Sequence, residues 1–374
     1  MSHLGLADKS NKKVFPNLVP WRFTDKQFTP WGGLRVFEEM LTRLGWPQAL
    51  ASAPLPQPRS NRGLDPVLMV KAFMVTIWTG GGRFAHTAMV RFDGALRGIF
   101  GLEQVASTST FTRFFRRFDR RQVEELFRHW SGWIWQRVAA RSWTVDLDSS
   151  VLTRYGEQEG VELGYNPWHR GKKSHHPLMA FAVECRMVIT AWLRSGNTTD
   201  SSNAENFFRE VLQVLGPRHR IGLLRCDSGF CIGSFLDLVE SQDINYIVVA
   251  RLLGTIKREL AGLQDWIELD GHRAVGEFTY QAQGWSRARR VVAVRHRLSQ
   301  RGEGKMLLEV PGYTYSVYVT NLSLPALQVR TLYQGRGGQR ESDQGTAQRF
   351  CHWGFCQPEI LGDRSRLPDG LLRL

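Results

Sequence analysis

The sequence predicts a mixed α/β fold, and three observations predict it. The hydrophobic period changes near residue 142, from helical spacing to strict alternation. The alternating segments that follow are joined by amphipathic ones, in the order β-β-β-α-β-α-β. Apolar residues make up 42% and charged residues 22% of the 374 residues, as in a protein with a sizeable buried core. This length suggests about two domains.

The N-terminal part predicts helices behind a polar arm. Residues 1–32 are polar and irregular, and 33–140 show helical patterns. The segment LRVFEEMLTRLGW (34–46) carries apolar residues at helical spacing and stops at a glycine. The segment DPVLMVKAFMVTIWTGGG (65–82) begins at a capping Asp-Pro pair and ends at glycines. Because Lys71 interrupts its apolar run, it predicts a buried helix and no membrane span.

A basic helix is predicted after Ser107, which can cap its first turn together with Ser109. Phe111, Phe114, Phe115 and Phe118 form its apolar stripe. The other face gathers arginines, namely Arg113, Arg116, Arg117, Arg120 and Arg121. Such a helix can dock on a DNA groove or backbone, which makes 33–140 a candidate DNA-binding region. The alternative is a solvated charged face.

The charge balance predicts a polyanionic partner. The formal net charge is +14, the sequence pI is about 10.0, and arginine greatly outnumbers lysine. Arginine binds phosphates bidentately, so nucleic acid is favoured over a merely soluble basic protein. The five cysteines form no C-x-x-C pair, which argues against a zinc ribbon or a disulfide framework and fits a reducing cytoplasm.

The predicted sheet brings three carboxylates into view. Asp146 and Asp148 share one face of the strand SWTVDLD (142–148), because side chains two apart point the same way. Asp227 ends a later strand, IGLLRCD (221–227), just before a glycine turn and a helix. Carboxylates at strand ends can bind Mg²⁺, and two metals can clamp the oxygens of a phosphoryl transfer. For Asp227, a capping role at the following helix is the alternative.

The remaining core elements are predicted from the hydrophobic period and from the glycine and proline residues between segments. They are a hairpin of PLMAFAVE (177–184) and RMVITAWLR (186–194), helices at 203–216 and 233–242, a strand at 245–251, and strand-like segments from about 265 to 320.

A linked series of motifs resembles the insertion-sequence DDE transposases of bacteria. The motifs are DLDSS (146–150), GEQEGVELGYNPWHRGKKSHHPLMAF (156–181), RSGNTTDSSNAENF (194–207), RCDSGF (225–230) and NYIVVARL (245–252), and the resemblance covers about residues 30–336. It implies an RNase H-like core over 141–336, with a β-rich insertion at about 265–320. It also implies Mg²⁺-dependent cutting of transposon ends, with Mn²⁺ as a substitute, and joining of the 3′-OH to target DNA.

The resemblance assigns the first catalytic carboxylate and metal ligand to Asp148 and the second to Asp227. Asp146 is the neighbouring alternative. The partners it implies are the inverted-repeat ends and the target DNA, bound by a homodimer in the synaptic complex. The expected location is the bacterial cytoplasm at the nucleoid. A DNA-binding protein without catalysis and an RNase H-like nuclease are the alternative functions.

A glycine-bounded loop between the first two acids carries further candidate DNA contacts. They are Tyr165, Asn166, Arg170, Lys172 and Lys173. Arginine and lysine suit phosphates, and tyrosine suits stacking on a splayed base. The alternative is a solvated hairpin tip.

Other polar residues near this loop have weaker assignments. His175 and His176 lack a cysteine or histidine partner at zinc spacing. Arg194 and Asn197 either line the site or form a plain turn.

The C-terminal segment departs from the family pattern. In similar transposases the segment after LYQGR continues as a helix of the kind A-D-x-E-N-R-I-K-E-L, whose Glu is the third metal ligand. Here residues 337–345 read GGQRESDQG, a poor helix. Codons for this stretch, read one base out of register, permit ADSENRIKE, so we predict that 337–374 is an out-of-frame tail. Glu341 is then a weak stand-in for the third acid. A true, divergent C-terminus with an acid from Glu277 or Glu309 is the alternative.

Overall fold

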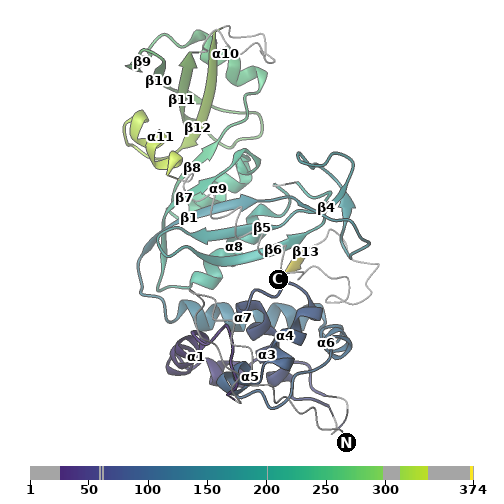
Figure 1. The fold of residues 1–374 in the computed structure, drawn as a ribbon. Coiled ribbons are helices and arrows are strands. Elements are labelled where there is room, and N and C mark those ends of the chain that lie inside the picture. The colour runs from purple at the N-terminus through teal and green to yellow at the C-terminus, as the bar shows by residue number, and fades with distance from the viewer. Residues whose placement is uncertain are drawn as a thin grey trace, which may run out of the picture.

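The computed structural model describes residues 26–58, 60, 63–199, 201–297, 312–335 and 371–373. Figure 1 shows a helical N-terminal part, a central sheet and a β-rich extension following one another along the molecule. Within the described residues, no helix has both the length and the apolar character needed to cross a bilayer.

The N-terminal helices enclose a core of their own. Asp65 begins the central helix as predicted, since its Oδ1 accepts the N–H of Val67 at 2.8 Å. The rings of Phe84, Phe111 and Phe115 stack beside this helix. The helices are α1 (Leu34–Arg43), α2 (Trp46–Ala51), α3 (Pro66–Trp78), α4 (Thr87–Phe92), α5 (Gly94–Phe100), α6 (Thr108–Phe115) and α7 (Arg120–Trp135), with a 3-10 turn η1 (Phe84–His86).

The predicted single basic helix is two helices, α6 and α7. Asp119 starts the second one through a capping box: its Oδ1 accepts the N–H of Gln122 at 2.8 Å, and Gln122 Oε1 accepts the N–H of Asp119 at 3.2 Å. The prediction of one helix was wrong because this start signal directly follows the last phenylalanine of the stripe, and helical spacing continues beyond it. The stripe itself is confirmed, since Phe111, Phe114 and Phe118 are buried.

The central sheet has the predicted RNase H-like arrangement. Its strands lie in the order β6-β5-β1-β7-β8, where β5 is antiparallel to β1 and β6, and β7 is parallel to β1 and β8. The strands are β1 (Ser142–Ser149), β5 (Leu178–Ala182), β6 (Met187–Arg194), β7 (Arg220–Cys226) and β8 (Asn245–Val249). The helices α8 (Ala204–Leu215) and α9 (Gly233–Ser241) connect them, so the order β-β-β-α-β-α-β is confirmed.

Different helices pack on the two faces of this sheet. Leu147 and Cys226 point to the face that packs on α8 and α9, in one large apolar cluster. The opposite face packs on helix α11 (Ala326–Gln334) through a smaller cluster that contains Ile247 and Val329. Because side chains alternate along a strand, Asp146 and Asp148 lie on the α11 face.

The predicted β insertion extends the central sheet. It contains β9 (Ile267–Asp270), β10 (Arg273–Tyr280), β11 (Arg289–Arg297) and β12 (Tyr313–Thr320), and α10 (Gly254–Gly262) precedes it. Strand β12 pairs antiparallel with β8, so the sheet continues as β8-β12-β11-β10-β9. At the other edge, β13 (Leu371–Arg373) pairs antiparallel with β6.

The segment between β1 and β5, predicted as a loop, forms a separate small sheet. We call it the subsheet; it has the order β2-β4-β3, with β2 (Leu152–Thr153), β3 (Glu162–Leu163) and β4 (Lys173–His175). Strands of two or three residues are too short to show a period of two in the sequence, which is why alternation did not reveal them. Figure 1 shows β4 projecting beside the central sheet.

Candidate active site

Asp148 and Asp227 lie side by side at the carboxyl ends of neighbouring parallel strands. Leu147 of β1 pairs with Cys226 of β7, and each carboxylate is the next residue along its strand. Adjacent strands are about 4.8 Å apart, so this register brings the two acids close together. Both residues are half-buried. The carboxyl ends of strands are where open α/β sheets bind their ligands.

Asp227 combines the two roles that its sequence suggested. It caps the short 3-10 helix η2 (Ser228–Phe230), because its Oδ1 accepts the N–H of Gly229 at 2.7 Å. A carboxylate has two oxygens and about four lone pairs, so one such bond leaves acceptor capacity. The cap therefore fixes the side chain without excluding a ligand role.

Asp146 has a different environment from Asp148. It is fully buried, and both of its oxygens accept hydrogen bonds from Arg225, at 2.7 Å from Nε and 2.8 Å from Nη2. Arg225 is 4% exposed, and its Nη1 donates to the carbonyl oxygen of Leu332 in α11 at 2.7 Å. The pair thus ties β1, β7 and α11 together. Burial and bidentate pairing favour a structural role for Asp146.

Sequence reasoning missed Arg225, although a signal was present. An arginine interrupts the otherwise apolar strand IGLLRC, and Asp146 interrupts the strand beside it. The two are partners in the register of β1 and β7. A charged residue in each of two neighbouring buried strands predicts a pair, because an isolated buried charge is costly.

The described residues supply no third acid to this site. Among them, no group of three Asp, Glu, His or Cys side chains could hold a metal ion. Glu277 lies on β10 in the insertion, four strands from β7, and binds Arg290. Glu309 and Glu341 fall outside the described residues. Helix α11, which precedes the expected position of the third acid, ends at Gln334 near Arg225.

The donor set at this edge fits a hard divalent cation. Asp148 and Asp227 offer carboxylate oxygens, the ligands that Mg²⁺ and Mn²⁺ prefer. Magnesium usually keeps several waters and takes only one or two carboxylates from the protein. The half-buried position of both acids is compatible with access from solvent.

The candidate DNA contacts of the helical region are only partly exposed. Arg113 and Arg116 are exposed, and Arg113 Nη2 donates to Thr110 Oγ1 at 3.3 Å. Arg117 is half-buried and donates to the carbonyl oxygen of Gln57. The side chain of Arg120 falls outside the described part of the structure.

The subsheet places most of its candidate DNA contacts in solvent. Tyr165 is 76% exposed, and Arg170, Lys172 and Lys173 are exposed as well. Asn166 is instead 4% exposed and stabilises the turn. Its Oδ1 accepts the N–H of Trp168 and of His169, at 3.2 and 2.9 Å, and its Nδ2 donates to Thr153 Oγ1 at 2.9 Å. These bonds favour a structural role for Asn166.

The two histidines at the base of the subsheet have internal partners. His175 Nε2 donates to the carbonyl oxygen of Glu159 at 2.8 Å, and its Nδ1 accepts from Arg154 Nε at 3.3 Å. Burial lowers the pKa of His175 to about 4, because the charged form would lose its hydration. His176 Nδ1 lies 2.7 Å from the carbonyl oxygen of Thr198.

Arg194 is a structural centre of the neighbouring turn. It is fully buried, and it donates to the carbonyl oxygens of His176, Thr199 and Ser202 at 3.0 to 3.1 Å. Asn197 is exposed on the same turn. These contacts favour the turn interpretation for Arg194.

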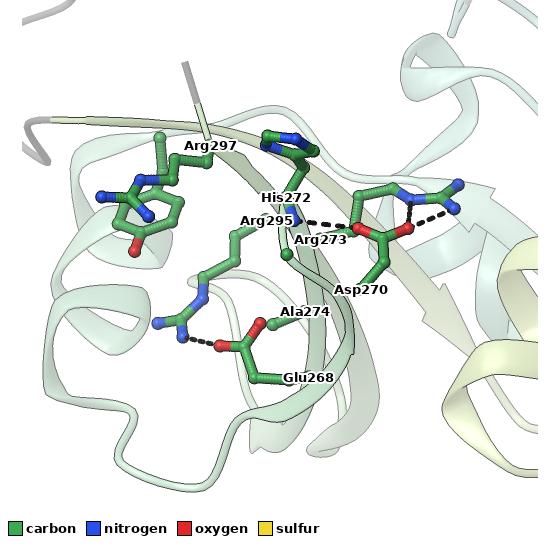
Figure 2. Close-up of a pocket in the computed structure, with 9 residues that line it drawn as sticks. Glu268, Asp270, His272, Arg273, Ala274, Arg295 and Arg297 are labelled. Atoms are coloured by element: carbon green, nitrogen blue, oxygen red, sulfur yellow. Dashed lines mark hydrogen bonds and ion pairs between the residues drawn. The ribbon is translucent and has the colours of Figure 1, made fainter. Parts of the chain in front are cut away.

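A pocket of about 350 Å³ lies at the outer end of the insertion (Figure 2). Glu268 accepts from Arg295 Nη2 at 2.7 Å, and Asp270 accepts from Arg273 Nε at 2.6 Å. The guanidinium of Arg295 also lies over two rings, 4.5 Å from the centre of Trp266 and 4.9 Å from that of Tyr313. Both carboxylates of this pocket therefore face an arginine.

One comparison with known proteins identifies a family. The family model described as transposase DDE domain, group 1, matches residues 11–343. A piggyBac transposase synaptic complex with hairpin DNA, solved by cryo-EM, aligns with a TM-score of 0.47 and 14% sequence identity. The alignment covers 83% of this chain and 66% of that chain, slightly less than two thirds of its length. A search of curated proteins finds no match.

Proposed function

Because the chain belongs to the transposase DDE domain family, group 1, we propose that it cuts transposon-end DNA and joins the freed 3′-OH to target DNA. The single observation that carries this proposal is the register of β1 and β7, which brings Asp148 and Asp227 together. Strand cleavage and strand transfer are both in-line phosphoryl transfers, for which positioned oxygen ligands and a divalent cation are suited.

Asp148 and Asp227 would hold the cation, Mg²⁺ or Mn²⁺. When bound, it supplies Lewis-acid activation of a phosphate oxygen and charge stabilisation at the leaving oxygen. The chain's own task is to hold the two carboxylates in place. The N–H of Gly229 holds the Asp227 carboxylate in place by donating a hydrogen bond to it. Pairing with β7 holds the strand that carries Asp148.

In our proposal, the chain cleaves DNA poorly because its third acid is poorly placed. Helix α11 ends at Gln334, on the face that carries Asp148. A helix continued to residue 340 would extend about 9 Å further along this face. The expected out-of-frame reading would place a glutamate at position 340. In the chain as it stands, GGQRESDQG occupies 337–345, and Glu341 is a weak substitute there. We therefore infer DNA binding with poor cleavage.

DNA is the proposed partner, and the charge distribution supports it. The net charge is +14, with exposed arginines at the end of α6 (Arg113 and Arg116) and exposed cations on the subsheet. Two transposon ends must be joined in one synaptic complex, so we expect two copies of the chain in it. Affinity for DNA should fall steeply with salt, since bound phosphates release counterions.

The test of the proposed function is a nicking assay on end DNA with Mg²⁺ or Mn²⁺. We expect weak metal-dependent nicking that disappears in Asp148→Asn and Asp227→Asn, while DNA affinity stays within about twofold. Nicking that survives in both variants would contradict the proposal. If the wild-type chain binds the ends but never nicks them under any metal, the second candidate, a DNA-binding protein without catalysis, replaces it. The lack of a third acid among the described residues specifically favours that candidate.

A further inference from the structure

The subsheet carries large aromatic side chains in solvent. Tyr155, Tyr165 and Trp168 are 80%, 76% and 73% exposed. Aromatic side chains normally bury 150–250 Å² each and dominate cores and interfaces. Several of them together on one surface therefore mark an interaction site. We call these three residues, with Arg170 and Lys172, the aromatic tip.

The strand directions bring these rings to one end of the subsheet. Strands β2 and β3 both pair antiparallel with β4, so they run parallel to each other. Tyr155 lies two residues after the end of β2, and Tyr165 lies two residues after the end of β3. Trp168 lies in the turn that leads from Tyr165 into β4. The three rings thus come from adjacent connections at the same end.

The aromatic tip is an ordered structure. Asn166 is buried and binds the backbone N–H groups of Trp168 and His169, which fixes the turn between the two exposed rings. At its base, Gly164 packs so closely that an added Cβ would lie 1.8 Å from the carbonyl oxygen of Gly196. Anchors that hold the exposed rings in place reduce the entropy that a ligand must overcome on binding.

The charge of the aromatic tip is complementary to phosphates. Arg170, Lys172 and Lys173 are exposed beside the rings. Glu157 lies 3.9 Å from Lys173, but this pair is exposed and contributes little. Rings interleaved with cations are the arrangement by which proteins bind single-stranded nucleic acid: the cations follow the backbone and the rings stack on bases.

The aromatic tip is joined directly to the strand that carries Asp148. The ladder between β1 and β5 continues past Ser149, where the N–H of Ser150 donates to the carbonyl oxygen of Pro177 at 3.1 Å. Tyr155 is seven residues after Asp148, which limits their separation to about 23 Å for an extended chain. That is within reach of a few nucleotides on either side of a bound phosphate.

We propose that the aromatic tip binds unpaired nucleotides of DNA next to the phosphate held at Asp148 and Asp227. This inference rests on the proposed function and names the form of DNA that this site takes. In a duplex the base faces are stacked on each other, so only single-stranded or flipped bases can cover the rings. A second copy of the chain is disfavoured as the occupant, because Arg170 and Lys172 would face their own copies.

The experiment measures binding of the full chain to two labelled probes by fluorescence anisotropy without metal. The probes are a twelve-nucleotide oligothymidylate and a blunt 20-base-pair duplex. Removal of a stacking ring should weaken oligothymidylate binding about 5- to 140-fold. The triple variant Tyr155→Ala, Tyr165→Ala and Trp168→Ala should lose at least about 100-fold with the oligothymidylate and less than about threefold with the duplex.

Two controls keep the result specific. Ile267→Ala removes an apolar side chain that is 68% exposed on β9 of the insertion, and it should leave both affinities unchanged. Trp168→Phe and Tyr165→Phe keep a ring, and they should retain most of the oligothymidylate affinity. Unchanged circular dichroism and melting temperature in the triple variant confirm that the loss does not arise from unfolding.

Two outcomes would overturn the inference. One is equal loss on both probes, which would reduce the aromatic tip to a general DNA contact. The other is unchanged oligothymidylate affinity. If the triple variant then changes the oligomeric state, the rings belong to a protein interface instead. Neither outcome bears on metal-dependent nicking, so the proposed function would stand or fall separately in its own assay.

Discussion

The edge of the central sheet and the outer pocket of the insertion use carboxylates in opposite ways. In the pocket, Glu268 and Asp270 each bind an arginine (Figure 2). At the sheet edge, Asp146 binds Arg225, whereas Asp148 and Asp227 lie next to each other. A carboxylate that faces an arginine serves the fold, because its charge is already compensated. Two carboxylates brought together at strand ends repel each other, and a bound cation would offset that repulsion, which is why we propose the metal site at this edge.

Aromatic rings show the same contrast. Trp266 and Tyr313 in the insertion lie against the guanidinium of Arg295. Tyr155 and Trp168 in the aromatic tip are at least 73% exposed. A ring that stacks on an arginine is already in contact within the insertion. An exposed ring in a turn of the aromatic tip is available to a ligand.

Restoring the third acid should have the largest effect. Replacing residues 337–345 by ADSENRIKE continues α11 and returns a glutamate to the sheet edge. We expect metal-dependent nicking of end DNA to rise at least about a thousandfold, since a complete metal site contributes several kcal/mol to the transition state. The measurement is a single-turnover nicking rate. The same replacement with the glutamate changed to glutamine is the control, and an equal gain there would contradict the role of the acid.

Breaking the buried pair should mainly affect stability. Asp146→Asn leaves Arg225 with an uncompensated buried charge and weakens its hold on α11. The free energy of unfolding should fall by about 3–5 kcal/mol. Urea denaturation followed by circular dichroism measures it. A loss below 1 kcal/mol would show that Arg225 and Asp146 are not the anchor that we describe.

Acid should destabilise the subsheet through His175. The folded protein lowers the pKa of His175 to about 4, whereas the unfolded value is about 6.5. The folded state therefore favours the neutral form of His175. The free energy of unfolding is highest above about pH 6.5 and falls as the pH drops toward 4. By pH 5 the cost is about 2 kcal/mol.

Urea midpoints at pH 7.5 and pH 5.0 measure this cost. His175→Gln should reduce the difference between the two pH values, and the exposed His272→Gln in the insertion should not. The same pH dependence in all three proteins would contradict the assignment to His175.

The smallest effect is expected in the insertion pocket. Glu268→Gln removes the exposed carboxylate that pairs with Arg295. Arg295 still keeps its contacts with the rings of Trp266 and Tyr313. The free energy of unfolding should change by less than about 1 kcal/mol, and oligothymidylate affinity should not change. A large loss in either measurement would mean that this pocket belongs to the DNA-binding surface.

The sequence predicted the parts of the fold that have long periodic segments. The strands around Val145, Leu224 and Ile247 and the two connecting helices follow from alternation, helical spacing and caps, so the order of the core was predictable. The subsheet was not, because its strands are two or three residues long. The break between α6 and α7 depends on the capping box at Asp119, which the continuous phenylalanine stripe obscured.

Individual site residues were predictable to different degrees. Asp148 and Asp227 come from strand ends and the family resemblance. The pairing of Asp146 with Arg225 depends on the register of β1 and β7. That register can be predicted only when it is known which strands are neighbours. Asn166 looked like a DNA contact because it is polar in a basic loop, but its three hydrogen bonds only become visible in the folded turn.

Binding of Mn²⁺ by the full chain tests most directly that Asp148 and Asp227 form one site. The free ion can be titrated by electron paramagnetic resonance at pH 7.5, with Glu277→Gln as a control acid in the insertion. We predict one saturable site that is weakened at least tenfold by Asp148→Asn and by Asp227→Asn, and unchanged in the control. Saturable binding that is the same in all four proteins would contradict the account.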